Sequence, residues 1–137
     1  MVVMLQREVA RRLVAPPGTR EYGILSVLAR YRTDARSLFH VSPDCFRPRP
    51  DVGSTVVSFV SREQPAADVA DETVLVRVVR AAFAHRRKTL LNSLRDEGFT
   101  REIRAVLEEA GIEPSRRAET LVLQEFARLA NGLHRIG

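Results

Sequence analysis

Three consecutive cations, Arg86, Arg87 and Lys88, are the strongest candidates for chemistry in this 137-residue chain. Apolar residues at helical spacing precede them, and a second apolar face begins with Leu90 and Leu91. Arginine and lysine bind phosphate oxygens, and such contacts position a protein on a nucleic acid without reading its sequence. We interpret the run as a phosphate-binding segment that opens a helix or continues into one. The alternative is a solvated charged face of a helical bundle.

A proline-stiffened loop, FRPRPDVGS, begins at Phe46 and is the second candidate. Pro48 and Pro50 each fix a backbone angle, so the loop can hold the ring of Phe46 in place. Enzymes that modify a base first take it out of its stack, and an aromatic face can then hold it. Phe46 is thus a candidate for stacking on a target base, and Arg47 and Arg49 could extend the phosphate-binding surface. The alternative is that Phe46 fills the core.

Other residue types that support catalysis or metal binding are isolated. The single cysteine, Cys45, excludes an internal disulfide and a multi-cysteine zinc site. His40, His85 and His134 have no second histidine or cysteine at ligand spacing, so we expect no metal. The serines have no nucleophile-elbow context, and no glycine-rich turn joins a strand to a helix. The sequence therefore shows no nucleotide-binding loop of its own.

The net charge of +5 and a pI near 10.5 favour a polyanionic partner. The surplus lies in residues 1–62, which hold ten arginines and five acids, whereas residues 63–137 hold twelve charges of each sign. The second half should therefore attract phosphate only where its cations cluster. Apolar runs are only a few residues long and no signal segment is evident, so we expect a cytoplasmic protein that does not enter a membrane.

The residues before the middle of the chain mix strand and helix patterns. An apolar run at 2–5 is typical of a fully buried strand of a parallel sheet. The next expected elements are two short helices, a strand, a proline-rich loop and a further strand, at 7–14, 22–31, 37–41, 43–53 and 55–60. The second helix should place Leu25, Leu28 and Ala29 on its inner face.

Beyond a polar linker at 63–70, the pattern is helical throughout. Asp71 and Thr100 can each cap a helix, Gly111 can end one, and Pro114 can begin a tight turn. The positions expected to face the core are Val74, Leu75, Val78, Val79, Ala82 and Phe83, then Ile103, Val106, Leu107 and Ala110, then Phe126, Leu129 and Ala130 in a last helix at 123–133. The predicted class is α+β, in which one edge of a larger sheet precedes a small helical bundle.

Four segments resemble, in order and spacing, the small-subunit (16S) ribosomal RNA adenine N6,N6-dimethyltransferases. They are MLQREVARRLVAPPGTREYG–LSVL, FRPRPDVGS, RAAFAHRRKTLLNSL and EEAGIEPSRRAETL–L–EFARLAN, which begin at Met4, Phe46, Arg80 and Glu108. These enzymes join a Rossmann-like domain to a helical domain and move methyl groups from S-adenosylmethionine to two adjacent adenosines. The resemblance implies a C-terminal half: the last three strands at 1–62, a linker at 63–70 and a helical rRNA-binding domain at 71–137.

The resemblance also assigns roles to individual residues. Phe46 matches an aromatic near the target base, and the run from Arg86 to Lys88 matches one that contacts rRNA of the small ribosomal subunit. The family's donor-binding parts and its Asn-Leu-Pro-Tyr motif have no counterpart here. The resemblance therefore implies that the chain holds no catalytic residue, binds no cofactor or metal, and cannot methylate unaided. Exposed sheet edges could also let copies of the chain associate.

The sequence departs from the family pattern at three positions. Asp51 and Gly53 stand where the family usually has Lys and Asp, which changes the charge and stiffness of the loop, and His85 replaces a usual Gln. Other functions stay open. They are a stand-alone RNA-binding module, a large-subunit rRNA methyltransferase of the macrolide-resistance type, a mitochondrial relative that serves as a transcription factor, and a structural protein with an incidental basic face.

Overall fold

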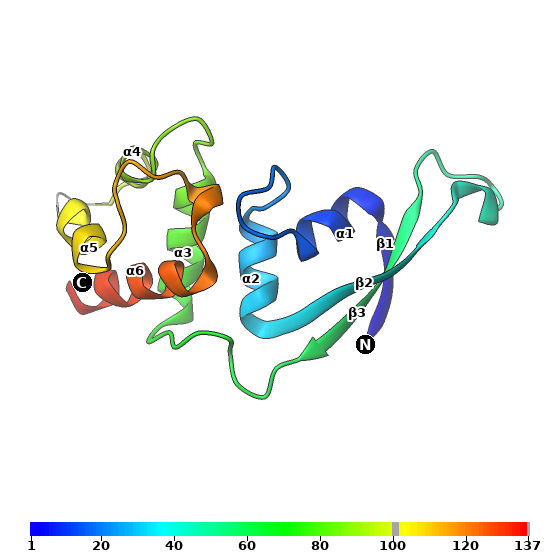
Figure 1. The fold of residues 1–137 in the computed structure, drawn as a ribbon, viewed down its shortest axis with the longest axis horizontal. Helices are drawn as coiled ribbons and strands as arrows, with labels where there is room; N and C mark the ends of the chain where they lie inside the picture. Colours follow the sequence, from blue (N-terminus) through cyan, green and yellow to red (C-terminus); the bar gives the residue numbers. More distant parts are fainter. Residues whose placement is uncertain (100–101, 137) are drawn as a thin grey trace.

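The protein is described by a computed structural model that covers residues 1–99 and 102–136. Figure 1 shows a sheet with helices beside it, followed along the long axis by a group of helices. The elements are β1 (Val2–Gln6), α1 (Arg7–Val14), α2 (Ile24–Arg32), β2 (Thr33–Val41), the 3-10 turn η1 (Pro43–Cys45), β3 (Ser54–Ser61), α3 (Glu72–Phe83), α4 (Leu90–Asp96), α5 (Ile103–Glu109), the 3-10 turn η2 (Ala118–Thr120) and α6 (Leu123–Ile136). The α+β class is therefore as predicted.

The sheet has the order β1-β3-β2, and β3 runs antiparallel to both neighbours. The prediction of a fully buried, parallel strand at 2–5 is wrong. Within the described residues, β1 pairs only with β3, and its side chains alternate between partly buried and exposed. Val2 is 63% exposed and Met4 51%, because α1 lies against the opposite face, where Thr55 and Val57 are buried. The apolar residues of β1 are therefore covered on one face of the sheet only, although their run predicted burial on both faces.

Helix α2 buries a different face from the one predicted. Leu25 is 42% exposed, whereas Ser26 and Val27 are fully buried. The hydroxyl of Ser26 accepts a hydrogen bond from the N–H of Gly23 (3.1 Å) and donates one to the carbonyl oxygen of Arg12. Because these bonds satisfy the hydroxyl, burying it costs little. The polar residue therefore faces α1, and the neighbouring leucine faces outward.

The segment between β3 and α3 is largely exposed, but a few of its residues pack against the core. Ala66 and Val69 lie against the core, and the N–H of Ala66 donates to the carbonyl oxygen of Tyr31 (3.0 Å). Near the C-terminal end of this segment, the Asn131 side chain donates a hydrogen bond to the carbonyl oxygen of Asp68 and accepts one from the N–H of Ala70. One core cluster joins Tyr22, Val27 and Tyr31 to the helices that follow. The domain limits at 1–62 and 71–137 remain a prediction.

The helical part follows its predicted caps and core positions. The Asp71 carboxylate accepts a hydrogen bond from the N–H of Thr73 (2.9 Å) at the start of α3. Gly111 has a left-handed φ of 75° just after α5, which favours glycine there. Thr100, the predicted cap, lies outside the described residues. Phe126, Leu129 and Ala130 are buried in α6, as predicted. No helix among residues 1–99 and 102–136 is long and apolar enough to cross a membrane.

Candidate nucleic-acid interface

The three-cation run lies in a turn, not in a helix as predicted. Helix α3 ends at Phe83, and α4 begins only at Leu90, after the Thr89 hydroxyl accepts from the N–H of Asn92 (3.3 Å). Between them, the N–H of Lys88 donates to the carbonyl oxygen of His85 (3.0 Å). The threonine cap starts the new helix after the cations. We call residues 84–89 the basic loop.

Arg86 binds the protein's own backbone. Its guanidinium donates hydrogen bonds to the carbonyl oxygens of Arg20 (2.6 Å) and Tyr22 (3.1 Å). Both acceptors belong to the segment that leads into α2, far from the basic loop in sequence. Arg86 thus fixes the loop against this segment, and two of its donor positions are taken before any phosphate arrives.

Lys88 and Arg87 differ in how available they are. Lys88 forms an ion pair with Asp96 at the end of α4, and its hydrogen bond to the Asp96 carboxylate lowers the pKa of that group. Arg87 is exposed, and within the described residues its side chain has no hydrogen-bond or ion-pair partner. Exposed pairs exchange readily with solvent and ligands. Arg87 is therefore free to bind phosphate, and Lys88 can bind it by leaving Asp96.

The Phe46 loop lies at the end of the sheet. The Ser42 hydroxyl accepts from the N–H of Asp44 (3.2 Å), and the N–H of Phe46 donates to the carbonyl oxygen of Pro43 (3.2 Å). Phe46 is partly buried and outside the core cluster. Arg49 pairs with Asp44 (3.0 Å), and Arg47 is exposed.

The structure places the Phe46 loop and the basic loop far apart. Figure 1 shows the first at the far end of the sheet and the second between α3 and α4, well apart along the long axis. Arg47 and Arg49 are therefore not next to the basic loop (Figure 1), and their part in RNA binding stays a prediction.

The segments on which the basic loop rests are themselves hydrogen-bonded to the chain between α5 and α6. The buried phenol of Tyr22 donates to the carbonyl oxygen of Leu121 (2.7 Å), and burial raises its pKa to about 12. The N–H of Leu90 donates to the carbonyl oxygen of Arg116 (2.6 Å). The Arg116 guanidinium in turn binds the carboxylate of Glu125. The residues that flank and support the basic loop are therefore fixed in place by hydrogen bonds.

Sequence reasoning missed three arginines beside the basic loop. Arg11, Arg20 and Arg80 line one groove together with Arg86, although they belong to three separate segments. For Arg11 and Arg20, the only signal in the sequence was the surplus of arginine in residues 1–62, and Arg80 lies outside that surplus. That signal indicates how many cations are present but not which ones meet.

At the junction of β1 and α1, Gln6 passes directly into Arg7, with no glycine turn that would let a backbone approach a nucleoside. Among residues 1–99 and 102–136, no group of three or more His, Cys, Asp or Glu side chains is placed to hold a metal ion. What the arrangement can do chemically is bind phosphate and offer partly exposed apolar side chains.

Two solved structures share this fold. A dimethyladenosine transferase from Plasmodium falciparum superposes with a TM-score of 0.75 at 22% identity, over 93% of this chain and 54% of its own. The 23S rRNA methyltransferase ErmE superposes with a TM-score of 0.61, also at 22% identity, over 97% of this chain and 54% of its own. The chain thus shares its fold with about half of each of these two proteins.

Sequence comparison narrows the class to one family. The family described as ribosomal RNA adenine dimethylase matches residues 1–135, and the chain belongs to this family. Similar relatives are the proteins named ribosomal RNA small subunit methyltransferase A of Geobacillus sp. (strain WCH70), 46% identical over 99% of the chain, and of Bacillus mycoides (strain KBAB4), 45% identical over 96%. The chain spans about half the length of these curated relatives, 48% and 47%.

Proposed function

We propose that the chain is the rRNA-docking part of an S-adenosylmethionine-dependent 16S rRNA adenine N6,N6-dimethyltransferase. One observation carries the proposal: in a member of this family, a basic loop fixed by Arg86 presents to solvent the side chain of Arg87, which is unpaired within the described residues. A cation on a fixed turn binds a phosphate with little loss of backbone entropy. The basic loop would dock helical rRNA through phosphate contacts, which position the enzyme without reading sequence.

The sheet supports a place at the edge of a Rossmann-like domain. Because β3 is antiparallel to both neighbours, β1 and β2 run in the same direction on either side of it. Doubly wound sheets often carry such an antiparallel strand near one edge. In this proposal, the Phe46 loop at the end of the sheet would face the target adenosine and hold it once flipped, with Phe46 as the stacking residue.

The methyl donor would be S-adenosylmethionine, which supplies an electrophilic methyl group when bound by the whole enzyme. Since no cradle for it forms among the described residues, we expect the chain alone not to bind it. Isothermal titration calorimetry of the chain with S-adenosylmethionine tests this directly. Micromolar binding would show that the donor site lies in this half.

RNA binding by the basic loop is tested with a fragment of helical 16S rRNA. Arg87→Ala should weaken binding. It should also reduce the magnitude of the salt slope, that is, of the slope of log binding constant against log salt concentration, by about 0.9, the value for one phosphate contact. Lys88→Ala should have a smaller effect, because Lys88 must first leave Asp96. The matched control is Arg135→Ala, which removes one exposed arginine near the end of α6. Equal slopes for Arg87→Ala and wild type would refute docking by this loop.

Competition between RNAs separates this proposal from a large-subunit function. A 16S rRNA fragment should displace a labelled 16S probe at lower concentration than a 23S rRNA fragment of equal length. The reverse order would favour a large-subunit enzyme, and equal potency would favour a module that binds RNA without a preferred subunit.

A further inference from the structure

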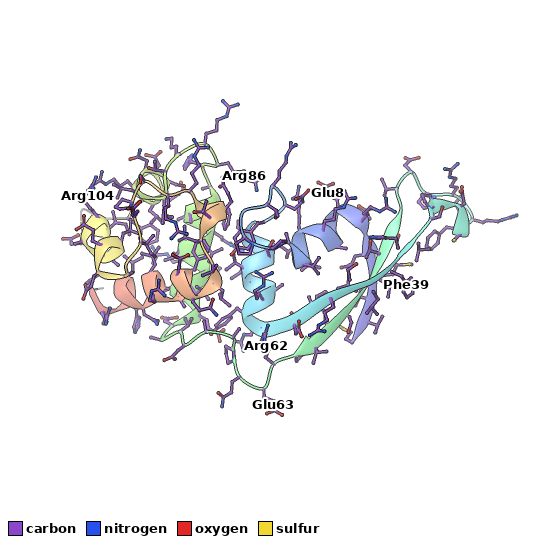
Figure 2. All side chains as sticks on the ribbon, in the orientation of Figure 1. Glu8, Phe39, Arg62, Glu63, Arg86 and Arg104 are labelled. Carbon is purple, nitrogen blue, oxygen red and sulfur yellow. The ribbon has the colours of Figure 1, made fainter. Side chains whose placement is uncertain are left out.

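A groove of about 870 Å³ lies between α1, α2 and the end of α3, next to the basic loop. We call its charged lining residues the walls of the groove; besides Glu8 and Glu21 they are Arg11, Arg12, Arg20, Arg80 and Arg86. Figure 2 shows Glu8 and Arg86, which both line the groove, on the same side of the molecule. The volume lies within the range of sites that bind small ligands.

The charges of the groove are unbalanced. Glu8 pairs with Arg12 (2.8 Å), and Arg86 is held by backbone carbonyl oxygens. The side chains of the other three arginines have no hydrogen-bond or ion-pair partner in the described part of the chain, and Glu21 is the one acid left to oppose them. Like charges that converge on one concave surface repel each other unless an anion joins them. The groove is therefore complementary to a polyanion.

The groove is also lined by apolar residues, which we call its floor. They are Ile24, Leu25, Leu28 and Phe83. Leu25 is 42% exposed. Phe83 is partly buried, with its ring fixed by edge contact with Tyr22 (centroids 6.0 Å apart) and by Phe126 (5.8 Å). Apolar side chains make no favourable contact with phosphate. Under a rigid duplex they would stay in contact with water, because the base faces of a duplex are stacked inside it. A single strand can turn its bases onto the floor and leave its phosphates on the arginine walls.

We propose that this groove binds a short single-stranded RNA segment, next to the helical RNA docked by the basic loop. The inference rests on the proposed function, since it assumes an RNA partner. Arg86 belongs both to the basic loop and to the groove wall, so the two surfaces are continuous. A strand that leaves a docked helix would enter the groove directly, where Arg11, Arg20 and Arg80 meet its phosphates and Leu25 meets a base.

Two probes test the proposal with the whole chain: a labelled oligoadenylate about ten nucleotides long, and a blunt RNA hairpin of similar phosphate number. We expect the triple variant Arg11→Ala, Arg20→Ala, Arg80→Ala to lose about two units of the log–log salt slope for the oligoadenylate, at roughly 0.7 per contact. Its slope for the hairpin should change by less than one unit. Leu25→Asn should weaken oligoadenylate binding severalfold and leave the salt slope unchanged, since it removes an apolar contact only.

Controls separate failure of this inference from failure of the proposed function. Arg135→Ala removes the same charge outside the groove and should leave both slopes unchanged. If the chain binds the hairpin through Arg87 but the triple variant leaves the oligoadenylate slope intact, the groove proposal alone is overturned. Equal losses for both probes, or no effect of Leu25→Asn, would also overturn it. Binding of neither RNA would refute the proposed function itself. Thermal melting of each variant shows whether it is folded at the temperature of the binding measurements.

Discussion

The phenol of Tyr22 donates a hydrogen bond of 2.7 Å to the carbonyl oxygen of Leu121, 99 positions later in the chain. Both residues are fully buried. Close by, the N–H of Gly18 donates to the carbonyl oxygen of Glu119 (2.7 Å). The segment before α2 and the turn before α6 are thereby joined, although one precedes the last two strands and the other lies among the final helices. The basic loop is built on this joined segment.

Replacing Tyr22 with Phe tests how much this junction contributes to stability. Tyr22→Phe keeps the ring packing and leaves the carbonyl oxygen of Leu121 buried without a donor, which should cost about 1–3 kcal/mol of unfolding free energy. Chemical denaturation measures the change. Tyr31→Phe is the matched control, because its hydroxyl makes only a long contact of 3.4 Å to Glu72. A larger loss in the control than in Tyr22→Phe would contradict this ranking.

The pH dependence of stability gives a second test at Tyr22. Burial raises the pKa of Tyr22 from 10.0 to about 12, which favours the neutral phenol in the folded state. A raised pKa stabilises the fold below the unfolded pKa, and this contribution disappears as the pH approaches the folded value. Wild-type stability should therefore fall between about pH 10 and 12, and Tyr22→Phe should show a shallower fall. Parallel curves for the two proteins would be inconsistent with this pKa.

Arg86 and Arg87 should separate folding from RNA binding. Arg86→Ala removes two hydrogen bonds to backbone carbonyl oxygens and should cost about 1–2 kcal/mol of unfolding free energy. Arg87→Ala should change stability by less than about 0.5 kcal/mol, since it removes an exposed side chain. Urea denaturation of both variants measures the difference. If both substitutions leave stability unchanged, Arg86 is not an anchor.

Glu125 should make stability depend on acid pH. Burial raises the pKa of this carboxyl, but hydrogen bonds from Arg116 and from the N–H of Val122 outweigh burial, and the pKa lies below its ordinary 4.5. A lowered pKa stabilises the fold above the unfolded value and is lost as pH falls through the folded value. Glu125→Gln should therefore cost about 1–3 kcal/mol at neutral pH. The gap to wild type should narrow below about pH 4.5.

The exposed pair of Glu8 and Arg12 provides the control for Glu125. Both of its side chains are more than half exposed, so Glu8→Gln should change stability by less than about 0.5 kcal/mol. Unfolding free energies measured from about pH 3 to about pH 7 compare the two variants. A gap for Glu125→Gln that is constant with pH would refute the assignment.

Phe46 should matter for chemistry more than for folding. In a full-length dimethyltransferase that carries this loop, Phe46→Ala should lower methylation by roughly tenfold or more, because base stacking is worth about 1–3 kcal/mol. Phe46→Tyr keeps the ring face and should retain most activity. A melting temperature that falls sharply, with normal activity in the remaining folded protein, would assign Phe46 to packing instead.

The order and type of most elements could be predicted from sequence, because local interactions determine them. Helix α3 has apolar residues at helical spacing after the Asp71 cap, and both the cap and the buried face are as predicted. Gly111, just after the end of α5, is also determined locally, because its left-handed φ favours glycine. A cap or a helical stripe is encoded within a few consecutive residues, so no distant contact is needed to recognise it.

Only the tertiary structure decided which cations of the basic loop are free. Arg86 and Arg87 are adjacent and chemically identical, yet one is bound to the carbonyl oxygen of Arg20, 66 positions away, and the other is exposed. Which of two neighbouring side chains finds a distant acceptor depends on how the chain packs. Composition and spacing carry no information about it.

The same reason explains the sheet and the groove. The apolar residues 2–5 predict a strand but not its direction or which face is covered. The direction follows from pairing with β3, fifty or more positions later, and the covered face from the packing of α1. Arg11, Arg20 and Arg80 are unremarkable in sequence and meet only because α1, α2 and α3 pack side by side. A periodic pattern specifies which side of an element is apolar. The neighbour that covers that side is set by long-range packing, and the exposed surface that remains determines what the protein can bind.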